Sequence, residues 1–94
     1  MTIRASIGDP SGRTVELTEE RWRHIVERHP EIETHGEVML RAVQKPDRQI
    51  AGRLSNEEWF YVETDAPSAW LKVIVAYAEG CGYIVTAYAR RSIP

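Results

Sequence analysis

Apolar residues recur at helical spacing in the first third of the chain. Trp22, Ile25 and Val26 fall on one side of a helix, which predicts a buried stripe. Thr18 is placed to cap this helix, and the two glutamates after it favour the positive end of the helix dipole. Pro30 disfavours helical geometry in the residue before it, so the helix is predicted to end at residue 29 or earlier.

A second helix is predicted between residues 34 and 46. The sequence THGE at 34–37 matches the capping-box pattern, in which a threonine hydroxyl and a glutamate side chain bond backbone N–H groups at a helix start. Apolar residues continue from Val38 to Val43, and Pro46 closes the segment.

Beyond Pro46 the pattern changes from helical to extended. Runs rich in β-branched and aromatic residues, separated by turn-forming residues, predict four strands. The predicted strands cover residues 48–53, 59–63, 70–77 and 83–89. A turn is expected at 64–68, and the tight connection at 79–82 predicts an antiparallel hairpin of the last two strands.

Two short extended runs, 2–7 and 13–17, precede the helices and flank a turn-forming segment, which predicts a further hairpin. No helix separates the later strands, so their connections favour an antiparallel meander over parallel βαβ units. We therefore predict a single α+β domain over residues 1–94, with N-terminal helices packed on a four- to five-stranded antiparallel sheet.

Composition narrows the function classes. The formal net charge of -2 argues against a broad positive field that attracts nucleic acid regardless of sequence. A local basic cluster stays open, because Arg21, Arg23 and Arg28 are close in sequence. Cys81 is the single cysteine, so no disulfide within the chain is expected. Because no signal peptide or membrane-spanning run is apparent, we expect a cytoplasmic protein that does not associate with membranes and folds alone or as a small oligomer.

Helix phase separates the first two histidines. His29 falls on the apolar stripe of the first helix, whereas His24 points nearly the opposite way. At a helix C-terminus the dipole stabilises a protonated imidazole, so His29 is a candidate for proton transfer. The alternative for His29 is a packed, hydrogen-bonded histidine, and for His24 a solvated helix face beside Glu27 and Arg28.

Alternation along the last predicted strand places Ile84, Thr86, Tyr88 and Arg90 on one face. A hydroxyl, a phenol and a guanidinium on one face are suited to binding a phosphate or another oxyanion. Lys72 on the neighbouring strand could add a second positive charge, although the sequence does not set its register. The alternative is an ordinary solvent-facing strand, on which these residue types are common.

The histidines do not have the spacing of a metal site. His24 and His29 are five residues apart, whereas helical ligand pairs usually lie three or four apart. No nucleotide-binding or serine-hydrolase motif is apparent, so neither a metal nor a cofactor is predicted. Four aromatic residues could stack on nucleic-acid bases or pack within the sheet, namely Trp59, Phe60, Tyr61 and Trp70.

Three segments together resemble a known superfamily. They are LTEERWRHIVERHPE at 17–31, PD at 46–47 and IVTAY at 84–88. In this order they are similar to small bacterial and phage proteins of the barnase, EndoU, colicin and RelE superfamily, over most of the chain. The resemblance implies helices packed on an antiparallel sheet and a metal-independent ribonuclease activity, often that of a toxin.

The resemblance also implies the residues of a catalytic site. By position these are His24, His29, Thr86 and Tyr88. The candidates for binding the substrate are Arg28, Lys72 and Arg90, of which Arg90 follows from strand alternation and not from the resemblance. In the implied reaction a ribose 2′-hydroxyl attacks the adjacent phosphate, while one group removes a proton and another protonates the leaving 5′-oxygen. RNA is then the substrate, and an antitoxin or another protein is a candidate partner.

Two other functions stay open. A non-catalytic module of the same fold would bind a protein or RNA as an accessory or antitoxin-like component, which suits a slightly acidic surface with exposed aromatic residues. A metal-dependent hydrolase built on the three histidines fits their spacing poorly. Chelator separates the two enzymes, because only the metal-dependent one would lose its activity.

Overall fold

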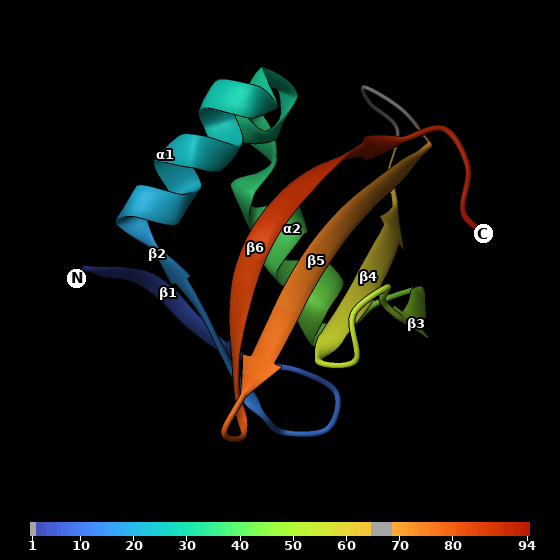
Figure 1. Cartoon of the computed structure of the whole chain (residues 1–94). Helices are drawn as coiled ribbons and strands as arrows, with labels where there is room; N and C mark the ends of the chain where they lie inside the picture. The colour runs from blue at the N-terminus through green and yellow to red at the C-terminus, as the bar shows by residue number, and fades with distance from the viewer. Residues whose placement is uncertain (1, 65–68) are drawn as a thin grey trace.

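A six-stranded sheet lies at the centre of the protein, whose computed structural model describes residues 2–64 and 69–94 (Figure 1). In chain order the elements of the described residues are β1 (Ile3–Gly8), β2 (Thr14–Thr18), α1 (Glu19–Arg28), η1 (Pro30–His35), α2 (Gly36–Gln44), β3 (Arg48–Ala51), β4 (Glu57–Glu63), β5 (Trp70–Ala78) and β6 (Cys81–Arg90). The short helix η1 is of the 3-10 type. Across the sheet the strand order is β1-β2-β6-β5-β4-β3.

The prediction of N-terminal helices on a four- to five-stranded antiparallel sheet is wrong. The sheet has six strands and is mixed, and both α-helices follow β1 and β2 in the chain. The N-terminal hairpin forms as expected, but β2 also pairs in parallel with β6, through Val15 with Gly82 and Glu16 with Tyr83. Pairing between strands so distant in sequence leaves no local pattern, so the sequence did not show that the hairpin joins the sheet.

Gly82 allows β2 to approach β6. A Cβ atom at this position would lie 2.8 Å from Tyr77 Cε1 and 2.9 Å from Val15 Cγ2, which is too close for non-bonded carbon atoms. Both neighbours therefore occupy the space that a side chain would need. The missing side chain of Gly82 is what lets the hairpin and the rest of the sheet meet.

The first helix, α1, begins and ends as predicted. The Thr18 side chain accepts a hydrogen bond from the Arg21 N–H, and Glu19 and Glu20 occupy the first turn. The helix ends at residue 28, with His29 as its C-cap, directly before the proline. Local capping chemistry therefore accounts for both ends.

The start of α2 differs from the prediction. Thr34 does not cap a helix at 34–37, because it lies inside η1 and its hydroxyl lies 3.2 Å from His35 Nδ1. Pro30 opens η1, where its missing N–H costs no hydrogen bond, and η1 leads directly into α2. The capping-box prediction is wrong because this short 3-10 turn takes up the residues assigned to it.

The hydrophobic core lies between the sheet and the helices. In Figure 1, α2 lies behind β4 and β5, and α1 runs beside the upper part of β6. The buried apolar residues of the main cluster are Val15, Leu17, Ile25, Ile32, Met39, Ala42, Val43, Phe60, Val62, Leu71, Val73, Val75, Ile84 and Ala87. The opposite face of the sheet, which points away from α2 and toward the viewer in Figure 1, is called the front face below.

A bulge in β6 changes which of its residues share a face. Ile74 pairs with Thr86, whereas the next residue, Val75, pairs with Ile84, so Val85 is one residue too many for the ladder. The predicted face shared by Ile84 and Thr86 is therefore wrong. Ile84 is buried in the core, and Thr86 lies on the front face. Strict alternation, on which the prediction relied, holds only on either side of the bulge.

The other strands differ from the predictions at their ends. Strand β3 stops at Ala51 rather than residue 53, and β4 begins at Glu57 rather than residue 59. The predicted turn at 64–68 lies outside the described residues from 65 onward. The last hairpin turns at Glu79 and Gly80, whose φ angles of 54° and 82° match the twist of the flanking strands. Within the described ranges, no helix is long and apolar enough to cross a membrane.

Candidate functional site

A row of polar side chains crosses the front face. Tyr61 on β4 pairs with Lys72 on β5, and Lys72 pairs with Tyr88 on β6. Residues paired across neighbouring strands point to the same face of a sheet, so the three side chains lie side by side. The register that the sequence left open therefore puts Lys72 directly beside Tyr88.

Lys72 is buried and enclosed by aromatic rings. Only 4% of it is exposed, and its Nζ atom lies 3.4 Å from the ring centre of Trp59, 5.8 Å from that of Tyr61 and 5.6 Å from that of Tyr88. Ring faces carry partial negative charge and stabilise a cation. Among the described residues, no carboxylate forms an ion pair with this ammonium group. Every fully buried side-chain nitrogen described has a hydrogen-bond partner, so this unpartnered Nζ atom must still reach solvent.

Lys72 faces a hollow of about 580 Å³ on the front face, which we call the lysine hollow. Its described lining residues are Arg53, Leu54, Glu57, Trp59, Tyr61, Lys72, Ile74, Tyr88, Arg90 and Pro94. The Glu57 carboxylate accepts a hydrogen bond of 2.9 Å from Trp59 Nε1, which holds the indole ring in place. Three basic groups against one acidic group, with two phenols, make this hollow suited to an anion.

His29 lies against Tyr88. The two ring centres are 5.1 Å apart, and the ring planes are inclined by 30°. The His29 Nδ1 atom lies 3.9 Å from a carboxylate oxygen of Glu31, and the same oxygen accepts a 3.5 Å hydrogen bond from the Ala89 N–H of β6. At 3.9 Å the contact with His29 is an ion-pair distance and not a hydrogen bond. Glu31 therefore lies between the imidazole and the last strand.

A second hollow, which we call the helix hollow, lies between α1 and β6. Its described lining residues are Arg21, His24, Ile25, Arg28, His29, Val85 and Thr86, and none of these is acidic. His24 and His29 both line this hollow. They differ in exposure as the helix phase predicted: His29, the C-cap of α1, is half-buried against Tyr88, whereas His24 is exposed.

The predicted site residues fall into two adjoining groups. Those in the helix hollow are His24, Arg28, His29 and Thr86. Those in the lysine hollow are Lys72, Tyr88 and Arg90. The ring contact between His29 and Tyr88 joins the two groups.

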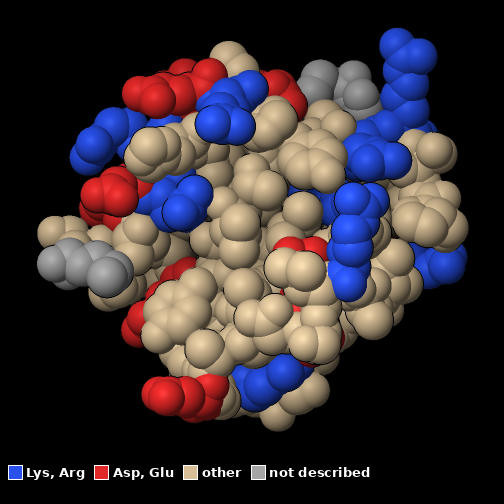
Figure 2. Space-filling model, viewed as in Figure 1, with Lys and Arg blue, Asp and Glu red and all other residues tan. Residues whose placement is uncertain are grey.

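Positive charge gathers at these two hollows despite the net charge of -2. Their described lining residues include five of the 12 lysines and arginines but only one of the 14 acidic residues. Figure 2 shows basic groups mixed with acidic ones on the α1 side and mainly basic groups on the β4 and β5 side of the front face, with mostly uncharged atoms between them. A slightly negative net charge is therefore compatible with two hollows that are lined mainly by basic residues.

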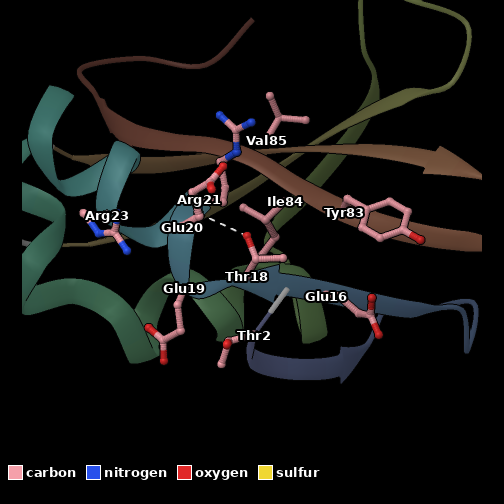
Figure 3. A pocket seen from close by; sticks show the side chains of 10 residues that line it. All are labelled: Thr2, Glu16, Thr18, Glu19, Glu20, Arg21, Arg23, Tyr83, Ile84 and Val85. Atoms are coloured by element: carbon pink, nitrogen blue, oxygen red, sulfur yellow. Dashed lines mark hydrogen bonds between the residues drawn. The ribbon is translucent and has the colours of Figure 1, made fainter.

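A third hollow lies between β2, the start of α1 and β6 (Figure 3). Three glutamates and two arginines line it, so charges of both signs are mixed there. Tyr83 and Val85 also line it and are 43% and 36% exposed. This hollow lacks the excess of basic over acidic residues found in the other two and is less suited to an anion.

A metal site finds no support in residues 2–64 and 69–94. No group of three or more His, Cys, Asp or Glu side chains there could hold a metal ion. The Nδ1 atom of His35 is already engaged, since it lies 2.8 Å from the Glu31 carbonyl oxygen. Cys81 is a free, half-buried thiol whose Sγ donates to the Gly82 carbonyl oxygen at 3.7 Å.

Two of the three rings that enclose Lys72, those of Trp59 and Tyr61, were not predicted as site residues. From the sequence they could either stack on bases or pack in the sheet, and the structure places both in the lysine hollow. Nothing in the sequence pointed to Arg53 or Glu57 as site residues, because it is the turn between β3 and β4 that brings them to the lysine hollow. Glu31 could have been found from the sequence, because it lies within the segment 17–31 that resembles the superfamily.

Comparisons with family models, with curated proteins and with solved structures find no match to this chain. The resemblance to the barnase, EndoU, colicin and RelE superfamily therefore stays a prediction. A function has to be proposed from the side chains of the front face themselves.

Proposed function

We propose that the front face binds RNA and cleaves it without a metal ion, so that the protein is a small cytoplasmic endoribonuclease of the toxin type. The position of Lys72 carries this proposal. Its ammonium group is enclosed by three aromatic rings and has no carboxylate partner among the described residues. Because this ammonium group reaches solvent at the lysine hollow, an anionic ligand there would form the ion pair that the fold does not supply. A phosphodiester has the charge and the acceptor oxygens for this position.

The reaction divides among the neighbouring side chains. The ribose 2′-oxygen forms a bond to the adjacent phosphorus and the bond from phosphorus to the 5′-oxygen breaks, which leaves a 2′,3′-cyclic phosphate and a 5′-hydroxyl. One group takes the proton of the 2′-hydroxyl and another supplies one to the 5′-oxygen. His29 carries one of these transfers, because an imidazole can both accept and donate a proton. Tyr88 and Lys72 stabilise the charge that develops on the phosphate oxygens.

Cleavage of total bacterial RNA by the purified protein in chelator tests this function. We expect products that end in a 2′,3′-cyclic phosphate. His29→Ala and Tyr88→Phe are each expected to lower the rate by about 100-fold or more, as removal of a general acid or base or of a transition-state donor does. Tyr83→Phe is the matched control, because Tyr83 lies exposed on the same strand. Its rate should equal that of the wild type.

Three outcomes would contradict the proposal. No cleavage by the folded wild-type protein would remove the catalytic function, and activity that disappears in chelator would indicate a metal-dependent hydrolase. Equal losses in Tyr83→Phe and Tyr88→Phe would show that the effect is not specific to the site. Circular dichroism of each variant separates loss of activity from loss of fold.

The alternative is a module that binds a protein without catalysis, as an accessory or antitoxin-like component. Tyr83 and Val85 favour it, because both are exposed apolar residues of β6 at the hollow of Figure 3. Expression in bacteria distinguishes the two functions. A toxin slows growth and His29→Ala relieves the effect, whereas a binding module is harmless.

A further inference from the structure

The lysine hollow and the helix hollow adjoin along β6. Tyr88 lines the first and Thr86 the second, and both side chains lie on the front face, two residues apart. Two residues along a strand correspond to about 7 Å. One nucleotide of an extended nucleic-acid strand can span this separation. The contact between His29 and Tyr88 marks the boundary between the two hollows.

The helix hollow carries its own unneutralised charge. Arg21, His24 and Arg28 recur at spacings of three and four residues, so they share one side of α1. Within the described ranges neither arginine forms an ion pair, whereas Arg4 and Arg13 are both paired with carboxylates. The Thr86 hydroxyl adds a neutral donor on the opposite wall. These groups are as well suited to binding a phosphate as are the groups of the lysine hollow.

We propose that the helix hollow is a second phosphate subsite, and that it binds the phosphate next to the one held at Lys72. The substrate is then single-stranded RNA that crosses β6, with consecutive phosphates on either side of Tyr88. A single strand is favoured over a duplex because its backbone can extend to match the spacing of the two hollows, whereas paired strands are held at a fixed spacing. This inference rests on the proposed function and adds the class of RNA and its path to it.

Binding of a short 2′-O-methyl RNA, measured over a range of salt concentrations, tests the second subsite. The methyl group blocks the attacking hydroxyl, so the probe binds without being cleaved. For a single strand, each phosphate contact contributes about 0.7 to the slope of log affinity against log salt, so we expect Arg21→Gln/Arg28→Gln to reduce the slope by about 0.7 to 1.4. The matched control is Arg41→Gln/Lys45→Gln, at two exposed residues in the last turn and at the C-cap of α2, which should leave the slope unchanged.

The outcomes separate this inference from the proposed function. An unchanged slope in Arg21→Gln/Arg28→Gln, beside weaker binding in Lys72→Met, overturns the second subsite and leaves the first in place. An equal reduction in the α2 control overturns it as well, since the effect would then come from total charge. A duplex that competes as well as the single strand overturns the proposed path. A reduced slope without cleavage of ordinary RNA supports the subsite and removes catalysis, and no binding by the wild type removes both.

Discussion

The two ends of β5 carry the same kind of contact in opposite electrostatic settings. Near one end the Arg13 guanidinium lies 3.8 Å from the ring centre of Tyr77, and near the other the Lys72 ammonium lies 3.4 Å from that of Trp59. Both are cations over an aromatic face. Arg13 also pairs with two carboxylates, whereas Lys72 pairs with none in the described part of the chain. The charge is neutralised at one end and available to a ligand at the other.

The Arg13 cluster, formed by Asp9, Arg13, Glu58 and Tyr77, satisfies its own polar groups. Asp9 accepts hydrogen bonds of 2.7–2.9 Å from the Ser11 and Arg13 N–H groups, the Arg13 side chain and the Tyr77 hydroxyl. Burial by itself would raise the pKa of Asp9, but the bonds from Tyr77 and Arg13 and the Arg13 charge lower it below its ordinary value. Burial and the hydrogen bond to Asp9 raise the pKa of Tyr77. The cluster fastens the turn of the first hairpin to β4 and β5.

Removal of the lysine charge is expected to have the largest effect. Lys72→Met keeps an unbranched side chain among the rings but removes the charge, so we expect cleavage to slow by about 10²–10³-fold. The free energy of unfolding should change by less than about 1 kcal/mol, because the volume is nearly conserved. RNA cleavage and urea unfolding measure the two quantities. An active variant, or one that is strongly destabilised, would contradict the division between the two ends of β5.

Removal of the buried carboxylate should have the converse effect. Asp9→Ala deletes the acceptor of four hydrogen bonds, so we expect the free energy of unfolding to fall by about 3 kcal/mol. Cleavage per folded molecule should be unchanged. The exposed Glu33 provides the control, since Glu33→Ala should cost less than about 0.5 kcal/mol. A fully stable but inactive Asp9→Ala protein would show that the Arg13 cluster belongs to the site.

Tyr77 belongs to the Arg13 cluster and Tyr88 to the lysine hollow, so the same substitution by Phe can be made in both regions. Tyr77→Phe removes a hydrogen bond to a charged acceptor and should lower the free energy of unfolding by about 1.5–3 kcal/mol without affecting the rate. Tyr88→Phe should do the reverse, with a change in unfolding free energy below about 0.5 kcal/mol and a loss of cleavage. Urea unfolding of both variants measures the change in the free energy of unfolding. Similar destabilisation of both proteins would mean that the Tyr88 hydroxyl is structural.

Stability should also depend on pH through the Arg13 cluster. Because the folded pKa of Asp9 is lowered, its contribution is present above about pH 4 and is lost as the pH falls through the folded pKa. Because the pKa of Tyr77 is raised, its contribution is present below about pH 10 and is lost as the pH rises through the folded pKa. Urea unfolding as a function of pH measures both. In Asp9→Asn the acid dependence should be weaker than in the wild type, and an identical profile would contradict this assignment.

Sequence patterns succeeded where the relevant residues are neighbours in the chain. The hydroxyl of Thr18 caps a helix three residues away, and the turn at Glu79 and Gly80 sets the final hairpin. The patterns failed at the capping box of Thr34 and at the face of Ile84. At Thr34 a 3-10 helix takes the place of the expected helix start. Between Ile84 and Thr86 a bulged residue interrupts the alternation on which the prediction relied.

By itself, the sequence determined α1, the two hairpins and the shared face of Thr86, Tyr88 and Arg90, because capping, turn geometry and alternation act within a few residues. Only the tertiary structure decided that β2 joins β6, that His24 and His29 line one hollow, and that Lys72 is enclosed by aromatic rings. These depend on register and packing between segments far apart in the chain, which no local pattern records. Whether a cation such as Lys72 is paired or free is therefore a property of the fold.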